Sequence, residues 1–280
     1  MREPAIRRAA VAGTWYPSDS HRLTAQLDAL VARADSDSKH APPRDAALIA
    51  LIAPHAGLVY SGPVAAHAYR LLRDRQYDTA VIVGPSHYVG FTGASIWPRG
   101  HFETPLGPAA IDEGVATAIL EQCPAIHERP DAHEREHSLE MQLPFLRTLA
   151  PGMRIVPIVM GQQTRETAFT VGDCIANVLK GRRALVIASS DLSHFFDAET
   201  AAFLDAQVVE DVEAIGDESL MARLERRPDH ACGGGPMVSV IRAARLLGVG
   251  SSRVLKYADS GDVSGDKVSV VGYLAAALWQ

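Results

Sequence analysis

Long apolar runs that end at a proline and a histidine occur twice early in this chain. The run AALIALIAPH covers residues 46–55, and the run TAVIVGPSH covers residues 79–87. Apolar runs of this length, bounded by Gly and Pro, are typical of strands buried on both faces. A helix is predicted between them, over residues 62–73. The right-handed crossover of such a unit should place the carboxyl ends of two adjacent parallel strands, and therefore His55 and His87, at one edge of a sheet.

The same alternation of apolar runs and helical patterns continues to the end of the chain. Further strands are predicted over residues 154–160, 184–188, 254–258 and 268–278. Further helices are predicted over residues 21–34, 111–122, 164–180, 198–215, 219–226 and 236–247. Pro144 should end or kink another apolar helix that begins near Leu139. We expect a single α/β domain over residues 1–280, a three-layer sandwich with a largely parallel or mixed central sheet and helices on both faces.

Composition narrows the class of protein. The 280 residues are 47% hydrophobic and 21% charged, which suits a chain with a substantial core. A formal net charge of -6 argues against a protein that binds nucleic acid by charge. No run approaches the roughly 20 apolar residues of a membrane span, and the first residues lack the apolar core of a signal peptide. Three cysteines are too few for a disulfide framework, so a cytoplasmic, soluble protein is expected, with no nucleic-acid or membrane partner.

Other polar segments should reach the same edge of the sheet, where α/β proteins bind their ligands. The strand over residues 184–188 runs directly into SSDLSH, which carries Asp191 and His194. The glycine-rich loop HACGGG places Cys232 just before a predicted helix, a position that favours the thiolate. His137 lies in a polar stretch ahead of the apolar helix. These side chains could meet the two histidines.

Two neutral imidazoles and one anionic ligand form a recurrent metal site with positions left open for water, dioxygen or substrate. On local grounds four residues compete for the anionic position: Asp191, Cys232, Glu136 and Glu140. A thiolate would favour copper or zinc while still permitting iron. His137 could be a ligand, a general base or a residue at the helix entry. Asp191 and His194 could instead form a turn that caps a helix.

Rival chemistries have weaker signatures. A serine hydrolase would need a G-x-S-x-G turn, which is absent, and SSDLSH crowds all three residue types of a triad onto one loop. The glycine-rich loop lacks the lysine of a phosphate-binding loop. HEREH, over residues 133–137, matches the letters of the zinc-protease motif H-E-x-x-H. That motif requires a helix, whereas these residues are predicted to precede one.

Eight segments resemble the Memo family, which includes the bacterial and archaeal members called AmmeMemoRadiSam system protein B. They are AGTWYP, IAPHAGLVYSGPVAAHAY, VGPSHYV, ETPLG, EHSLEMQLPFL, ASSDLSHF, ACGGGP and DKVSVVGYLAAAL, in family order over nearly the whole chain. The resemblance implies the fold of the class III extradiol-type nonhaem iron dioxygenases. It also implies a metal pocket formed by His55, His87 and Cys232. Cys232 stands where the dioxygenases have a glutamate.

The resemblance further implies that His137, Asp191 and His194 line this pocket, with a catalytic role. Trp15 and Tyr60 match aromatic residues linked, in eukaryotic relatives, to phosphotyrosine-peptide binding. One hypothesis is a redox enzyme that uses iron or copper, with zinc as a third option, and His137 or His194 as its acid–base group. The other is a non-catalytic accessory protein that binds a peptide, a small molecule or a metal, with AMMECR-type and radical-SAM proteins as partners.

Overall fold

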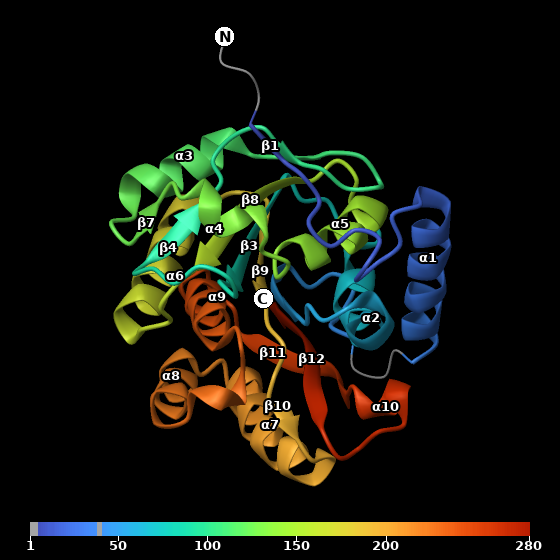
Figure 1. The fold of residues 1–280 in the computed structure, drawn as a ribbon. Helices are drawn as coiled ribbons and strands as arrows, with labels where there is room; N and C mark the ends of the chain where they lie inside the picture. The colour runs from blue at the N-terminus through green and yellow to red at the C-terminus, as the bar shows by residue number, and fades with distance from the viewer. Residues whose placement is uncertain (1–4, 38–40) are drawn as a thin grey trace.

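A nine-stranded mixed sheet runs through the centre of the computed structural model, which describes residues 5–37 and 41–280 (Figure 1). Its strand order is β10-β12-β2-β9-β3-β8-β4-β7, and β11 also pairs with β12. The four central strands are parallel: β2 (Leu48–Ala53), β9 (Ala184–Ser189), β3 (Thr79–Pro85) and β8 (Arg154–Met160). Because helices cover both faces of this part of the sheet, these strands are apolar on both faces, as the uninterrupted runs predicted.

Antiparallel pairing makes the sheet mixed. The strand β12 (Val270–Trp279) pairs antiparallel with β2, and β4 (Ala94–Ile96) pairs antiparallel with β8. The remaining strands of this sheet are β10 (His194–Phe196), β11 (Ser251–Asp259) and β7 (Ile126–His127). A small separate sheet contains β1 (Ile6–Arg7), β5 (His101–Phe102) and β6 (Ala109–Ala110).

Helices lie on both sides of the central sheet (Figure 1). The crossovers from β2 to β3 and from β8 to β9 run in opposite directions along the sheet, so right-handed connections place α2 and α6 on opposite faces. On the side of α2 (Leu58–Tyr69) lie α1 (Ser20–Ser36) and α5 (Leu143–Leu149). On the side of α6 (Arg165–Leu179) lie α9 (Gly234–Leu246), α3 (Glu113–Gln122) and α8 (Asp217–Arg226).

The helix α7 (Ala198–Glu213) packs against β11 and β12. Two short helices, α4 (Pro130–Glu134) and α10 (Gly261–Ser264), complete the α-helices of the described residues. The shorter 3₁₀ turns cover Arg70–Leu72, Glu140–Gln142 and Pro228–His230. Within residues 5–37 and 41–280, no helix combines the length and apolar character that crossing a membrane requires.

Three details of the sequence-based predictions were wrong. The strands β2 and β3 are not adjacent, because β9 lies between them. Pro144 does not end a helix, because a 3₁₀ turn ends at Gln142 and α5 continues past the proline to Leu149. It occupies the first turn of α5, where N–H groups have no acceptor within the helix. The N–H that proline lacks therefore costs no helical hydrogen bond. The helix α2 begins at Leu58, earlier than predicted, so it starts soon after His55.

Candidate metal centre

The carboxyl ends of three parallel strands bring the histidines together. His55 follows β2, His87 follows β3, and Ser189 ends β9, which lies between them. The fourth segment is the loop before α9, which carries Cys232. This loop is joined to the end of β9 by a 3.2 Å hydrogen bond from the amide of Cys232 to the carbonyl of Asp191. Segments distant in sequence therefore meet at the edge where the sequence predicted a site.

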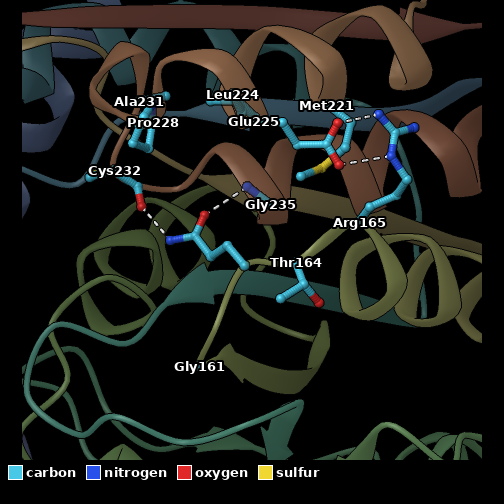
Figure 2. A pocket seen from close by; sticks show the side chains of 11 residues that line it. Gly161, Thr164, Arg165, Met221, Leu224, Glu225, Pro228, Ala231, Cys232 and Gly235 are labelled. Carbon is cyan, nitrogen blue, oxygen red and sulfur yellow. Dashed lines mark hydrogen bonds and ion pairs between the residues drawn. The ribbon is translucent and has the colours of Figure 1, made fainter.

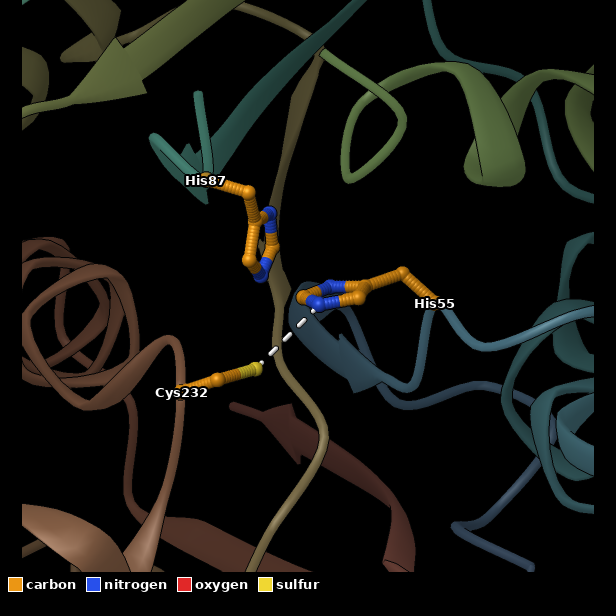
Figure 3. A group of neighbouring side chains, drawn as sticks. All are labelled: His55, His87 and Cys232. Atoms are coloured by element: carbon orange, nitrogen blue, oxygen red, sulfur yellow. Dashed lines mark hydrogen bonds between the residues drawn. The ribbon is translucent and has the colours of Figure 1, made fainter. Parts of the chain in front are cut away.

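His55, His87 and Cys232 point toward one another (Figure 3). The sulfur of Cys232 lies 3.2 Å from Nε2 of His55, and the two imidazole centroids are 5.2 Å apart. One candidate donor atom from each of the three residues lies within 4.8 Å of the others. Ligands bound tetrahedrally at about 2.0–2.3 Å from one metal ion lie about 3.3–3.8 Å from one another. The donor set and its spacing are therefore compatible with a single ion.

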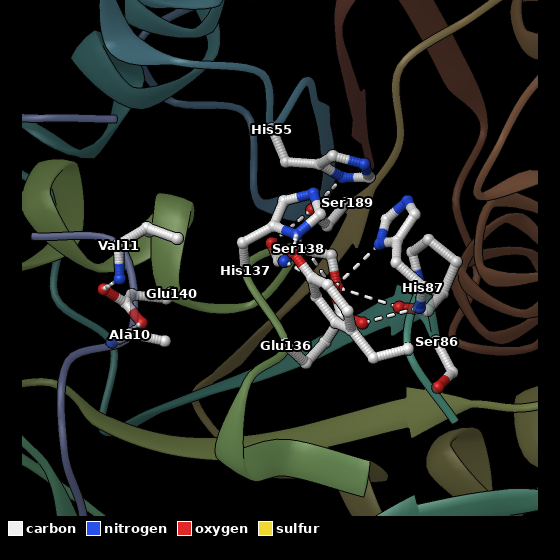
Figure 4. A network of polar contacts seen from close by, with 12 residues as sticks. Ala10, Val11, His55, Ser86, His87, Glu136, His137, Ser138, Glu140 and Ser189 are labelled. Atoms are coloured by element: carbon white, nitrogen blue, oxygen red, sulfur yellow. Dashed lines mark hydrogen bonds and ion pairs between the residues drawn. The ribbon is translucent and has the colours of Figure 1, made fainter. Parts of the chain in front are cut away.

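The outer nitrogen of each imidazole is held by the protein. Nδ1 of His55 lies 2.8 Å from Oγ of Ser189, and Nδ1 of His87 lies 2.9 Å from Oε1 of Glu136. The Glu136 carboxylate also accepts hydrogen bonds from the amides of His87 and Ser138, at 2.6 and 2.9 Å (Figure 4). Metal-bound histidines commonly have this kind of outer partner, which orients the ring. Glu136 therefore supports His87, although His87, Glu136 and His137 form an alternative group of potential ligands.

Burial keeps His55 neutral, whereas the hydrogen-bonded Glu136 stays charged. It lowers the pKa of His55 to about 3, with a smaller contribution from His87. The pKa of Glu136 is raised by burial but lowered more by its hydrogen bonds with His87, and it falls to about 2. His55 is therefore an uncharged imidazole at neutral pH, which is the form that binds metals.

The expectation of a thiolate at Cys232 was wrong for the protein alone. The residue keeps some exposed surface, but burial of its sulfur and the nearby Asp191 raise the pKa of the thiol. A bound cation acts in the opposite direction because it stabilises the deprotonated sulfur, so metal binding would release a proton here.

His137 covers one side of this cluster. Its ring stacks on His87 with centroids 4.3 Å apart, and Trp15 packs against it at the same centroid distance. The hydroxyl of Tyr88 lies 3.4 Å from Nδ1 of His137. Sequence reasoning missed Tyr88, although it directly follows His87 in VGPSHYV. Tyr60, at the start of α2, is 41% exposed, and no described ring contact links it to the cluster.

Asp191 and His194 lie beside the cluster, outside the group of potential ligands. Oδ1 of Asp191 accepts the amide of His55 at 2.7 Å, and burial raises the pKa of this carboxyl to about 6. Nδ1 of His194 lies 2.8 Å from the carbonyl of Leu192.

Glu140 is not an alternative ligand in the described structure. Its buried carboxylate pairs with Arg7 and accepts a 2.6 Å hydrogen bond from the hydroxyl of Tyr16. It also accepts the amides of Ala10 and Val11, at 2.7 and 3.1 Å (Figure 4). Through these hydrogen bonds and the ion pair, Glu140 holds the N-terminal segment that carries Trp15 against the rest of the protein.

The letters HEREH do not form a zinc-protease helix. His133 lies in the short helix α4, which ends at Glu134, so His137 lies beyond the end of that helix. Nε2 of His133 is 3.0 Å from Oγ of Ser95, outside the cluster. The two histidines therefore do not share a helix face, as expected, although the first two residues of HEREH belong to the short helix α4.

A cavity of about 520 Å³ is lined in part by Cys232, whereas neither His55 nor His87 lines it (Figure 2). Gln163 links the Cys232 loop to α9, because its amide donates to the carbonyl of Cys232 and accepts from the amide of Gly235, both at 2.7 Å. Sequence reasoning missed Gln163, although it follows β8, another strand whose carboxyl end reaches this edge. Arg165 and Glu225 form an ion pair beside the cavity.

Known proteins match this chain along nearly its whole length. The family described as Memo-like protein matches residues 7–277. A MEMO1 family protein of Methanothermobacter thermautotrophicus is 38% identical over 272 residues, covering 96% of this chain and 98% of the relative. A MEMO1 family protein of Methanocaldococcus jannaschii is 38% identical over 284 residues, covering 98% and 99%. An uncharacterized protein of Escherichia coli K12 shares the fold at 13% identity, with a TM-score of 0.52 over 81% of this chain and 99% of that one. The family resemblance is confirmed, and the chain belongs to the Memo family.

Proposed function

We propose that this protein is a redox metalloprotein that binds one iron or copper ion through His55, His87 and Cys232, with zinc as a third possible metal. The observation that carries the proposal is the convergence of three donor atoms within 4.8 Å. The outer nitrogens of both imidazoles are occupied by hydrogen-bond partners, which leaves each Nε2 for the ion. We further propose that this pocket and its sheet are of the extradiol dioxygenase type, with Cys232 in place of the usual carboxylate.

Several residues would act on a molecule held beside the ion. Iron or copper would supply one-electron chemistry at the coordination positions that the protein leaves open. His137 is 6% exposed, and burial, with smaller contributions from His55 and His87, lowers its pKa to about 3, so its ring is uncharged at neutral pH. Trp15 restricts access of water to this ring by packing against it. Asp191, which accepts the amide of His55 at 2.7 Å, and His194 would shape another part of the pocket.

A second candidate function is binding without catalysis. Tyr60 and Tyr88 are 41% and 45% exposed, and both follow strands whose carboxyl ends carry the proposed ligands. Exposed aromatic side chains are typical of surfaces that bind other molecules. The protein would then present a peptide, a small molecule or a metal to AMMECR-type and radical-SAM partners in the cytoplasm. Oxygen consumption with a panel of catechols separates the two functions, because only the redox enzyme would consume oxygen.

Replacing Cys232 with serine tests the proposed metal site. Cys232→Ser removes the soft ligand, so copper affinity should fall by at least about tenfold. Mutation of a residue that only hydrogen-bonds to a ligand already lowers metal affinity by about this factor. Competition titrations with a chromophoric chelator, on protein without a histidine tag, measure this affinity. Cys174→Ser is the matched control, because Cys174 is a buried thiol outside the cluster. Unchanged copper and iron affinities in Cys232→Ser would rule out the thiol as a ligand.

A further inference from the structure

A chain of buried hydrogen bonds runs from α2 to the proposed metal site. The hydroxyl of Tyr69 lies 2.6 Å from Oε1 of Gln142, and Nε2 of Gln142 lies 2.7 Å from Oγ of Ser189. The same Oγ lies 2.8 Å from Nδ1 of His55. All four residues are at most 1% exposed, so water does not replace any of these partners. The positions of the protons in this chain can therefore be derived from the heavy atoms alone.

The orientation of the Gln142 amide is fixed by two main-chain carbonyls. One end of the amide faces the carbonyl oxygens of Pro54 and Ser138, at 3.2 and 3.4 Å. Carbonyl oxygens only accept hydrogen bonds, so this end must be the NH₂ group. The other end is then the amide oxygen, and the Tyr69 hydroxyl donates to it. It follows that the NH₂ group of Gln142 also donates to the hydroxyl of Ser189.

The single proton of Ser189 has only one destination. Its hydroxyl lies 2.6 Å from the carbonyl of Ser138, which can only accept. A hydroxyl has one proton to donate and two lone pairs, and Gln142 occupies the first lone pair. The remaining lone pair faces Nδ1 of His55 at 2.8 Å, so this nitrogen must carry the proton. A neutral imidazole has one N–H, and Nε2 of His55 is therefore the lone-pair nitrogen.

We propose that Ser189, oriented by Gln142 and Tyr69, is a positioning residue that fixes His55 as the Nδ1–H tautomer before any metal arrives. This inference rests on the metal site proposed above and deepens it. The Nε2 lone pair faces the Cys232 sulfur, 3.2 Å away, so the protein presents the donor form of His55 without rearranging a proton.

The two histidine ligands would then differ in strength. Nδ1 of His87 is backed by the charged carboxylate of Glu136, whereas Nδ1 of His55 is backed by the neutral hydroxyl of Ser189. A carboxylate partner raises the basicity of a metal-bound imidazole more than a neutral acceptor does. His87 is thus the stronger donor, and the role of the Ser189 chain is to set the tautomer and orientation of His55.

Nitrogen-15 spectra of the full-length, metal-free protein at neutral pH test this proposal directly. Long-range proton–nitrogen correlations distinguish a protonated ring nitrogen from an unprotonated one, and loss of signals in His55→Gln assigns the ring. Wild-type protein should show His55 as a single Nδ1–H tautomer. Ser189→Ala removes the acceptor, so the Nε2–H tautomer should appear, and copper affinity should fall by about tenfold or more. Ser95→Ala is the matched control, because Ser95 is a buried serine that contacts a different histidine, His133.

The outcomes separate this inference from the proposed function. An Nε2–H tautomer of His55 in the wild-type protein would overturn the inference, even if Ser189→Ala failed to fold. An unchanged tautomer and unchanged affinity in a folded Ser189→Ala would also overturn it. A single Nδ1–H tautomer in a protein that binds neither iron, copper nor zinc would leave the hydrogen-bonded chain in place and refute the metal site.

Discussion

His87→Ala is expected to abolish stoichiometric metal binding and to lower affinity for iron or copper by at least about 100-fold. Outer-sphere changes alone weaken metal sites by about 10- to 100-fold, and this change removes a ligand itself. Only His55 and Cys232 would remain in the donor group. The Glu136 carboxylate would also lose the Nδ1 partner that it holds at 2.9 Å. Elemental analysis of protein purified without a histidine tag, followed by titration with each metal, measures the effect.

His127→Ala is the matched control for this experiment. His127 is an exposed histidine on β7, which lies at the far end of the sheet from β2. Its loss should leave both stoichiometry and affinity unchanged. Equal metal content in His87→Ala and the wild-type protein would show that the ion, if one binds, lies elsewhere.

Glu140→Gln is expected to lower the free energy of unfolding by about 3–5 kcal/mol. The substitution keeps the shape of the side chain but removes its charge, so Arg7 would be left as a buried cation without a counterion. The hydroxyl of Tyr16 would also lose its charged acceptor. Urea unfolding of the metal-free protein at neutral pH measures the change. Because Glu140 holds the segment that carries Trp15, contact between Trp15 and His137 should weaken as well.

An exposed ion pair provides the control. Arg165 and Glu225 form two hydrogen bonds, at 2.9 and 2.6 Å, but both side chains are about 40% exposed. Solvent screens such pairs, so Glu225→Gln should change stability by no more than about 1 kcal/mol. A Glu140→Gln protein as stable as Glu225→Gln would mean that the buried pair with Arg7 does not hold the N-terminal segment.

The convergence of His55, His87 and Cys232 could be predicted from the sequence because local patterns determine it. The apolar runs before His55 and His87 identified parallel strands, and such strands end at one edge of a sheet. The glycines around Cys232 also marked a loop that approaches other chain segments closely. A Cβ at Gly233 would lie 2.5 Å from the carbonyl oxygen of Ser189, so the loop can pack there only with glycine.

Other features could not be predicted because they depend on contacts between distant segments. Glu140 looked like a possible ligand until the fold placed Arg7 against it, 133 positions away in sequence. The protonated state of Cys232 depends on burial and on Asp191, which local reasoning about a helix N-terminus does not include. The tautomer of His55 depends on Ser189 and on Gln142, 47 positions before that serine. Each of these is an electrostatic or hydrogen-bonding property of the assembled fold.

The most direct test of the central claim is anomalous X-ray scattering from crystals of the tag-free protein loaded separately with iron and with copper. We expect one ion, identified at its own absorption edge, between Nε2 of His55, Nε2 of His87 and the sulfur of Cys232. The expected bonds are about 2.0–2.1 Å to nitrogen and about 2.3 Å to sulfur, distances taken from zinc sites with the same ligand types. An ion bound by Glu136 and His137 in place of Cys232, or no ion at this edge of the sheet, would contradict the account.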